Sequence, residues 1–226
     1  MKFQKILLDI DNTIYDYEST HQLALSAIKQ FFLTNFGVLE SDFVHLYSQA
    51  RKIIHINLSE TASAHNRLLY FQKLLELIKI NPLKYALTLY NLYWDTFINN
   101  IKFFDGVVEL LTKYRNNICF LTDLTADIQL KKINLLNLDQ YANCIVTSEE
   151  AGKEKPHPFI FHLALEKLKI QKYDVCMIGD SYSKDIVGAI NLEIKSIWLN
   201  RTNEKREYEP NLVVEVNEFH NILNLV

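Results

Sequence analysis

The chain has 226 residues, of which 49% are hydrophobic and 23% are charged, enough for one large domain or for a core with a smaller inserted domain. Its formal net charge of −3, from 24 basic and 27 acidic side chains without a basic block, argues against a nucleic-acid or membrane-surface partner. No apolar run approaches the roughly 18 residues that span a bilayer, and the N-terminus leads directly into a strand-like segment rather than a signal peptide.

The first expected element is a strand over residues 3–9, which ends at two acids. Asp9 and Asp11 follow the apolar run Ile6–Leu8, and alternate side chains of a strand point to the same face. Two neighbouring carboxylates repel each other unless they share a cation or a proton. The pair therefore indicates a divalent metal with a nucleophile and an acid, although an isolated acidic pair is also typical of a solvated loop.

Helical periodicity runs through residues 17–101 and predicts an inserted helical unit. Ser19 and Gln22 have the form of a capping box at the start of its first helix, which Gly37 closes. Further helices are expected from residue 41, up to residue 80, and around residues 89–97. We therefore predict two domains: an α/β core of residues 1–16 and 102–226, and a helical cap of residues 17–101.

Strand and helix patterns alternate in the rest of the chain. The expected strands are mostly continuous apolar runs, as in strands covered on both faces, and span residues 118–122, 144–147, 175–179, 196–199 and 212–216. Helical patterns separate them near residues 106–115, 126–137, 158–169 and 183–192. This alternation predicts a doubly wound α/β fold with a parallel sheet and right-handed crossovers.

Three cysteines lie in these runs, at Cys119, Cys144 and Cys176. They are widely separated and lack the spacing of a zinc site, so buried thiols in a reducing compartment are favoured over disulfides. We therefore expect a cytoplasmic protein.

Other strand ends also carry polar residues. Thr122 and Asp123 end one strand, and Gly179-Asp180-Ser181 ends another with Asp185 beyond it. Lys155 stands directly before Pro156-His157-Pro158, whose prolines fix the backbone around it. Ligands of open α/β sheets bind outside the carboxyl ends of the strands. These residues are therefore expected to gather around Asp9.

The ordered set of motifs resembles the haloacid dehalogenase (HAD) superfamily. Motif one is Asp9-Ile10-Asp11-Asn12-Thr13, motif two ends at Thr122, motif three is Lys155, and motif four is Gly179-Asp180-Ser181 with Asp185. The helical insertion between the first two motifs resembles the C1-type cap of this family. The resemblance implies a HAD-like Rossmannoid core and a small phosphate ester as substrate.

The resemblance also implies a role for each acid. Asp9 would attack phosphorus to form an aspartyl-phosphate, and Asp11 would protonate the leaving oxygen and then activate water. Mg²⁺ would be held by Asp9, the backbone carbonyl of Asp11, and Asp180. Asp185 would either be a further ligand or orient Lys155 or a metal-bound water.

The phosphoryl oxygens would be held by Thr122, Lys155 and backbone groups at Asn12 and Asp123. Asp123 departs from the Asn or Gly that is common after the motif-two residue, so we expect it to point away and cap the next helix. The charges of the four acids would be offset by Mg²⁺, Lys155 and a protonated Asp11, which predicts strict Mg²⁺ dependence.

The acid at Asp11 favours phosphoryl transfer over dehalogenation, because a leaving halide needs no proton. A phosphatase is the commoner outcome, and a phosphomutase stays open as the alternative. The Asp-Asn-Thr form of motif one resembles nucleotidase-like and sugar-phosphate phosphatases such as N-acylneuraminate-9-phosphatase, so a nucleoside monophosphate or sugar phosphate is the expected substrate. Two other classes stay open: a receiver-like phosphoacceptor and a catalytically silent binding protein. A monomer or a homodimer is expected.

Substrate specificity is expected to depend on the cap and the segment that enters it. Tyr15 and Tyr17 follow motif one, and Arg51, His55 and Arg67 are polar residues on otherwise apolar helices. The pattern alone favours solvated helix faces for the last three, so both interpretations stay open. Aromatic residues of the last cap helix are expected to form the cap core: Tyr85, Tyr90, Tyr93, Trp94 and Phe97.

Overall fold

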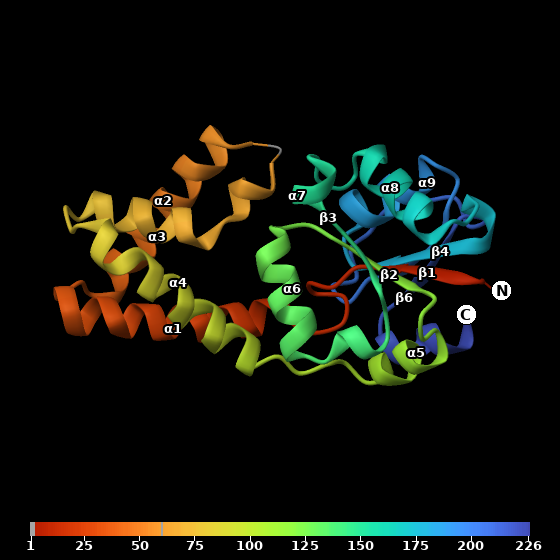
Figure 1. Cartoon of the computed structure of the whole chain (residues 1–226), viewed down its shortest axis with the longest axis horizontal. Coiled ribbons are helices and arrows are strands. Elements are labelled where there is room, and N and C mark those ends of the chain that lie inside the picture. Colours follow the sequence, from red (N-terminus) through yellow and green to blue (C-terminus); the bar gives the residue numbers. More distant parts are fainter. Residues whose placement is uncertain (1–2, 60) are drawn as a thin grey trace. The chain divides into compact units, whose positions relative to one another are not determined.

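The computed structural model describes residues 3–59 and 61–226 and divides the chain into two compact units (Figure 1). The core unit runs up to Asp16 and resumes at Lys102, and the cap unit comprises Tyr17–Ile101. Among the described residues, every helix is too short or too polar to cross a membrane.

A six-stranded sheet with the order β3-β2-β1-β4-β5-β6 forms the centre of the core unit, and every neighbouring pair is parallel. The predicted doubly wound parallel sheet is therefore confirmed. From β1 the chain adds β2 and β3 on one side of the sheet, and it then adds β4, β5 and β6 on the other side. The order of strand addition therefore reverses between β1 and β4, where Leu7 pairs with Met177. The strands are β1 (Lys5–Leu8), β2 (Ile118–Thr122), β3 (Cys144–Thr147), β4 (Val175–Gly179), β5 (Lys195–Leu199) and β6 (Val213–Val216).

Helices cover both faces of this sheet. In Figure 1, α8 and α9 lie on one face, and α5 lies on the other beside the C-terminal η5. The α-helices of this unit are α5 (Val107–Lys113), α6 (Ala126–Leu135), α7 (Ser148–Ala151), α8 (Pro158–Leu168) and α9 (Val187–Ile190). Short 3₁₀ or π segments complete it: η2 (Leu138–Gln140), η3 (Lys172–Asp174), η4 (Tyr182–Ile186) and η5 (Phe219–Asn224).

One helix differs from the sequence prediction. Residues 183–192 were expected to form a single helix, but the structure has the π-turn η4 followed by the short α9. The backbone N–H groups of Asp185 and Ile186 both donate to the carbonyl of Ser181, at 2.8 and 3.3 Å, which widens this turn.

Burial explains the continuous apolar runs of the strands. Leu7, Cys119 and Met177 pack in one cluster with Phe161 of α8, and all four are fully buried. The cysteines are free thiols, as predicted, and the Sγ atoms of Cys119 and Cys144 on the paired strands β2 and β3 are 2.9 Å apart.

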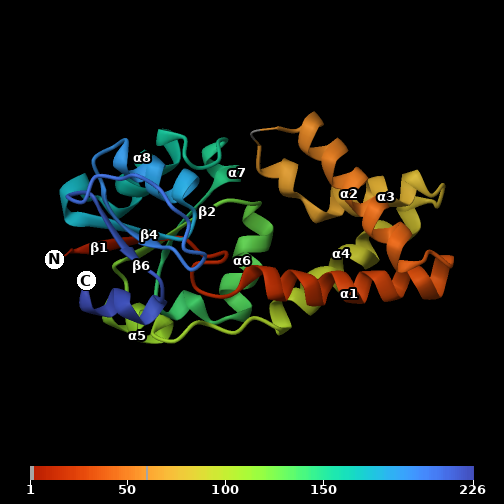
Figure 2. The ribbon, with the colours of Figure 1, turned by 180° about the vertical axis from the view of Figure 1, so that it is seen from behind.

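The cap unit consists of α1 (Tyr17–Phe36), α2 (Glu40–Asn57), the turn η1 (Ala62–His65), α3 (Arg67–Leu77) and α4 (Pro82–Asn99). Figure 2 shows α1 and α4 side by side, and they share one of the most extensive contacts between elements of the structure. Asn81 caps α4 through its side chain, which accepts a hydrogen bond from the N–H of Leu83.

The capping box predicted at the start of α1 is wrong. The helix begins at Tyr17, so Ser19 lies within its first turn, and the side chain of Gln22 donates to Glu18 instead, at 2.6 Å. The end of α1 agrees with the prediction, because Gly37 follows Phe36 with a positive φ of 68°.

The aromatic core predicted for the cap is present. Tyr90, Tyr93, Trp94 and Phe97 of α4 are buried, and the ring centroids of Trp94 and Phe97 are 5.2 Å apart. Tyr85 is half-buried and packs against two phenylalanines of α1. These side chains therefore pack the cap core instead of forming a stacking surface.

Candidate active site

The motif residues gather at the carboxyl ends of three adjacent strands. Asp9 follows β1, Thr122 ends β2, and Asp180 follows β4, and in the sheet β1 lies between β2 and β4. The position between β1 and β4 is also the point where the order of strand addition reverses. In doubly wound folds this crevice is the usual place for a ligand.

Lys155 binds the nucleophile candidate directly. Its Nζ lies 2.6 Å from Asp9 Oδ1, 2.6 Å from Asp185 Oδ1 and 3.1 Å from the carbonyl oxygen of Leu121. Both ion pairs are buried. The second oxygen of Asp185 accepts a hydrogen bond from the N–H of Ser181, at 3.0 Å, so Asp185 holds Lys155 in place with both oxygens engaged.

Motif four needs a glycine because Asp185 approaches its backbone closely. A Cβ atom on Gly179 would lie 2.4 Å from the carboxyl carbon of Asp185, closer than any real side-chain contact. A larger residue at Gly179 would therefore displace Asp185 from Lys155.

Asp11 is held by three side chains that the sequence analysis did not assign to it. Lys132 of α6 lies 2.5 Å from Asp11 Oδ1, Gln129 of the same helix donates to Oδ2 at 2.9 Å, and the hydroxyl of Tyr15 donates to Oδ1. Gln129 also donates to Thr122 Oγ1, at 2.8 Å. One face of α6 therefore positions two motif residues.

The remaining residues of motif one tie Asp180 to Asp9. Thr13 Oγ1 donates to Asp9 Oδ2 at 2.9 Å and accepts the backbone N–H of Asp180 at 3.0 Å. Asn12 has a left-handed backbone, with φ of 67°, and its amide donates to Asp180 Oδ2 at 2.7 Å. Asn12, predicted to bind phosphate, thus holds Asp180 through its side chain.

The expectation that Asp123 caps the following helix is wrong. Its Oδ1 accepts the backbone N–H of Lys155, at 3.1 Å, and its Oδ2 forms an ion pair of 2.8 Å with Lys184. The helix α6 has Thr125 at its N-cap position. Lys184 offsets the charge of Asp123 and also pairs with Glu154, at 3.5 Å.

Burial sets the charge state of the other acids. It raises the pKa of Asp9 and of Asp185 above the ordinary 3.8, and the ammonium of Lys155 offsets only part of this effect. Burial, together with the charge of Asp9, raises the pKa of Asp180 to about 6. Lys155 alone is therefore not enough to stabilise the ionised forms of these three carboxylates.

Asp11 behaves in the opposite way. Burial alone would raise its pKa, but Lys132 and the hydrogen bonds from Tyr15 and Gln129 outweigh burial, so the pKa of Asp11 lies below 3.8. The protonated Asp11 that the sequence-based charge balance needed is therefore replaced by a buried cation, Lys132. The site contains four carboxylates and two lysines, so its net charge is −2 when all six groups are ionised.

A divalent cation fits this site. Oxygen atoms of Asp9, Asp180 and Asp185 lie within 4.8 Å of one another, and carboxylate oxygens are the ligands that Mg²⁺ prefers. A single divalent ion also supplies the two positive charges that the site lacks.

The raised pKa values predict that the metal-free protein loses stability as pH rises. Between pH 4 and about pH 7 the folded state binds more protons than the unfolded state at Asp9, Asp180 and Asp185, so the free energy of unfolding falls with pH. His21, whose pKa is lowered from 6.5 to about 3 by burial, acts in the opposite sense over part of this range but is one group against three. Asp11, with its lowered pKa, acts only below this range.

Thermal denaturation in EDTA should therefore give a lower midpoint at pH 8 than at pH 5. Added Mg²⁺ should raise the midpoint more at pH 8, because it binds the ionised carboxylates. A midpoint in EDTA that increases from pH 5 to pH 8 would contradict the assignment of these charge states.

The sequence matches the haloacid dehalogenase-like hydrolase family over residues 6–199, which is most of the chain. This chain belongs to that family. The match includes all four motifs and the cap, so the family resemblance of the motifs is confirmed.

Several phosphatases are relatives of this HAD hydrolase. It is 30% identical to the ribulose-1,5-bisphosphate 5-phosphatase of Halopiger xanaduensis, with 88% of this chain and 85% of the relative covered. It is 26% identical to the pyrimidine 5′-nucleotidase of Escherichia coli, covering 88% and 87% of the two chains. The N-acylneuraminate-9-phosphatase of Mus musculus is also 26% identical, with 89% and 84% covered.

A solved structure has the same fold. The magnesium-bound HAD hydrolase of Bacillus subtilis superposes with a TM-score of 0.74 at 18% identity, covering 100% of this chain and 99% of that one. At this identity the likeness establishes the fold alone.

The residues predicted to contact substrate lie in different environments. Tyr15 is fully buried and donates to Asp11, and Tyr17 is half-buried beside Arg67 in the cap. Arg51 is exposed, and His55 is half-buried with its Nε2 2.6 Å from the hydroxyl of Tyr70. A solvated face is therefore wrong for Arg67, which is buried.

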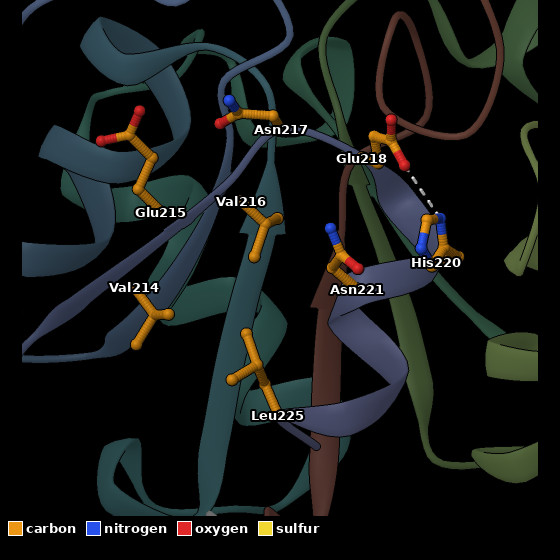
Figure 3. Close-up of a pocket in the computed structure, with 8 residues that line it drawn as sticks. All are labelled: Val214, Glu215, Val216, Asn217, Glu218, His220, Asn221 and Leu225. Atoms are coloured by element: carbon orange, nitrogen blue, oxygen red, sulfur yellow. Dashed lines mark ion pairs between the residues drawn. The ribbon is translucent and has the colours of Figure 1, made fainter.

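A separate pocket lies near the C-terminus of the core unit (Figure 3). Its lining includes an ion pair of 3.3 Å between His220 and Glu218, but none of the motif residues. We assign no catalytic role to it.

Proposed function

We propose that this HAD hydrolase is a Mg²⁺-dependent phosphatase that hydrolyses a small phosphate monoester through an aspartyl-phosphate on Asp9. The relatives that match nearly the whole chain are phosphatases or a nucleotidase, which supports hydrolysis of phosphoric monoesters. The observation that carries the proposal is the buried Asp9 carboxylate, bound to Lys155 and set beside Asp180 and Asp11.

In the first step, a carboxylate oxygen of Asp9 forms a bond to phosphorus as the bond from phosphorus to the ester oxygen breaks. Asp11 gives a proton to the departing oxygen, which leaves as an alcohol. In the second step Asp11 takes a proton from water, and the hydroxyl attacks the phosphorus of the aspartyl-phosphate. Inorganic phosphate leaves and Asp9 is regenerated.

Asp9, Asp180 and the backbone carbonyl of Asp11 would hold Mg²⁺, which would neutralise the phosphoryl oxygens and admit the anionic substrate. Lys155 stabilises the charge on Asp9 and on the phosphoryl group, and Asp185 orients Lys155. Thr122 is held at the end of β2 by Gln129, and its hydroxyl, which donates to the carbonyl of Asp123 at 3.3 Å, would turn to a phosphoryl oxygen.

Asp11 is an anion in the free protein, so it must gain its proton when substrate binds. A dianionic phosphoryl group beside it raises its pKa, because like charges disfavour the ionised form. Lys132 limits this rise and keeps Asp11 able to release the proton again in the second step.

Replacement of Lys132 by methionine should therefore lower kcat by roughly 10- to 100-fold, the usual range for a group that orients a catalytic residue. The pH limb of kcat/KM that reports Asp11 should move to higher pH, since Lys132 lowers the pKa of Asp11. Lys131→Met is the matched control, because Lys131 is an exposed neighbour on the same helix that pairs with Asp127. An unchanged pH profile in Lys132→Met would contradict this role.

The proposed function is tested by a phosphate-release screen with Mg²⁺ over nucleoside monophosphates, sugar phosphates, sugar bisphosphates and small phosphoesters. The Asp9→Asn variant is the blank. Release of phosphate from some members of the panel, absent in the blank, is the expected result. Interconversion of sugar phosphates without release of phosphate would indicate a mutase. A phosphoaspartate that lasts for minutes would indicate a phosphoacceptor. Inactivity on the whole panel would indicate a catalytically silent binding protein.

A further inference from the structure

Arg67 is a buried cation in the cap unit. It begins α3 with 8% of its surface exposed, and its guanidinium donates to the carbonyl oxygen of His65 at 2.9 Å and to the hydroxyl of Tyr17. The guanidinium carbon lies 5.1 Å from the ring centroid of Tyr70 and 5.5 Å from that of Tyr93. Within residues 3–59 and 61–226, no carboxylate pairs with Arg67, and its Nε has no hydrogen-bond partner.

A second unpartnered donor lies in the same cluster. Tyr47 of α2 is 7% exposed, and its hydroxyl has no hydrogen-bond partner among the described residues. Its ring centroid is 6.1 Å from that of Tyr70, over which Arg67 lies. His21 contributes no negative or positive charge, because burial and the two arginines Arg67 and Arg51 lower its pKa to about 3.

The guanidinium of Arg67 therefore lacks an anionic partner, and the hydroxyl of Tyr47 lacks an acceptor, among the described residues. A buried guanidinium is normally paired with an anion, and tyrosine rings beneath it offset only part of its desolvation cost. A buried Tyr hydroxyl likewise normally finds an acceptor. A group with several acceptor oxygens and a negative charge would satisfy both the Nε of Arg67 and the hydroxyl of Tyr47.

We propose that the cap unit contains a binding site for a small oxyanionic group, either a carboxylate or a phosphate, with Arg67 as its cation and Tyr47 as a hydrogen-bond donor. The group can come from two sources: a second charged group of the substrate, or a free anion. The planar guanidinium is suited to both, because it binds carboxylate and phosphate oxygens in pairs.

The first experiment needs no turnover and is therefore independent of the proposed function. In the ¹⁵N-labelled full chain without metal, the Nε–H resonance of Arg67 is assigned by its loss in Arg67→Lys. Titration with inorganic phosphate, and separately with malonate, should move this resonance in a saturable way. Arg115→Lys is the control, because Arg115 is an exposed arginine that lies over a tyrosine ring in the core unit.

The variant Tyr47→Phe distinguishes a role of the Tyr47 hydroxyl in anion binding from a role of the side chain in packing of the cap. If Tyr47 binds the anion, this variant should weaken the affinity for malonate by about 5-fold, the effect of one neutral hydrogen bond. Its thermal midpoint without anion should stay the same or rise, since the variant removes a buried hydroxyl that has no partner. This variant keeps the proposal testable if changes at Arg67 unfold the cap.

The source of the anion is distinguished by kinetics on a matched pair of substrates. 3-Phosphoglycerate carries a carboxylate where glycerol 3-phosphate carries a hydroxymethyl group. If the anion belongs to the substrate, Arg67→Met should lower the ratio of kcat/KM for the first over the second by about 100-fold, because a buried charge pair loses one partner. If the anion is free, the resonance moves but this ratio is unchanged.

The proposal is overturned by an Arg67 resonance that neither phosphate nor malonate moves, which would make Arg67 a packing residue of the cap. Absence of all phosphatase activity would refute the proposed function but leave the resonance test intact.

Discussion

Replacement of Asp9 by asparagine is expected to lower kcat by at least about 10⁴-fold, the scale seen when a covalent nucleophile is removed. An amide oxygen is a poor nucleophile, so the bond to phosphorus cannot form at a useful rate. The fold should tolerate the change, because burial already disfavours the charged form of Asp9. Lys155 also keeps its second carboxylate partner, Asp185.

The measurement is steady-state phosphate release on the best substrate of the screen, with the thermal midpoint as a check of folding. Asp127→Asn is the matched control, since Asp127 is an exposed acid on α6 that pairs with Lys131. Intact-mass measurement of the wild-type protein after rapid quenching should show a phosphorylated species that Asp9→Asn lacks. Wild-type turnover in Asp9→Asn would refute the assignment of the nucleophile.

Removal of Mg²⁺ is expected to abolish turnover, with a loss of at least about 10³-fold in excess EDTA. The physical reason is charge: without the metal, four carboxylates face two lysines, and the surplus of two negative charges repels a phosphate dianion. The repulsion is strong because two of these acids, Asp9 and Asp185, are buried.

Activity should return fully when Mg²⁺ is added back in excess over EDTA. Asp180→Asn should raise the Mg²⁺ concentration needed for half-maximal rate by about 10- to 100-fold, as expected when one ligand loses its charge. Asp127→Asn should leave that concentration unchanged. Full turnover in EDTA would exclude the metal from the mechanism.

The sequence predicted the strands well because their information is local. The runs around Leu7, Phe120 and Met177 are continuously apolar, and such runs of this length form strands that are covered on both faces. The acids that follow those runs must then lie at one edge of a parallel sheet. The gathering of Asp9, Thr122 and Asp180 therefore followed from the order of the motifs along the chain.

Local patterns were less informative where hydrogen bonds to distant residues decide the outcome. Asp123 was expected to cap a helix, but Lys184 and the backbone of Lys155 bind it instead. Both partners come from segments that are far from Asp123 in the sequence. No periodicity or spacing around Asp123 contains this information.

Lys131 and Lys132 show most directly what the sequence determines and what only the tertiary structure determines. The sequence by itself placed both on a helix after motif two, and it placed Asp11 at the end of the first strand. Only the tertiary structure decided that Lys132 is fully buried against Asp11 while Lys131, one residue earlier, has 47% of its side chain exposed. Neighbouring helix residues point about 100° apart, so the orientation of α6 on the sheet selects which lysine meets the acid.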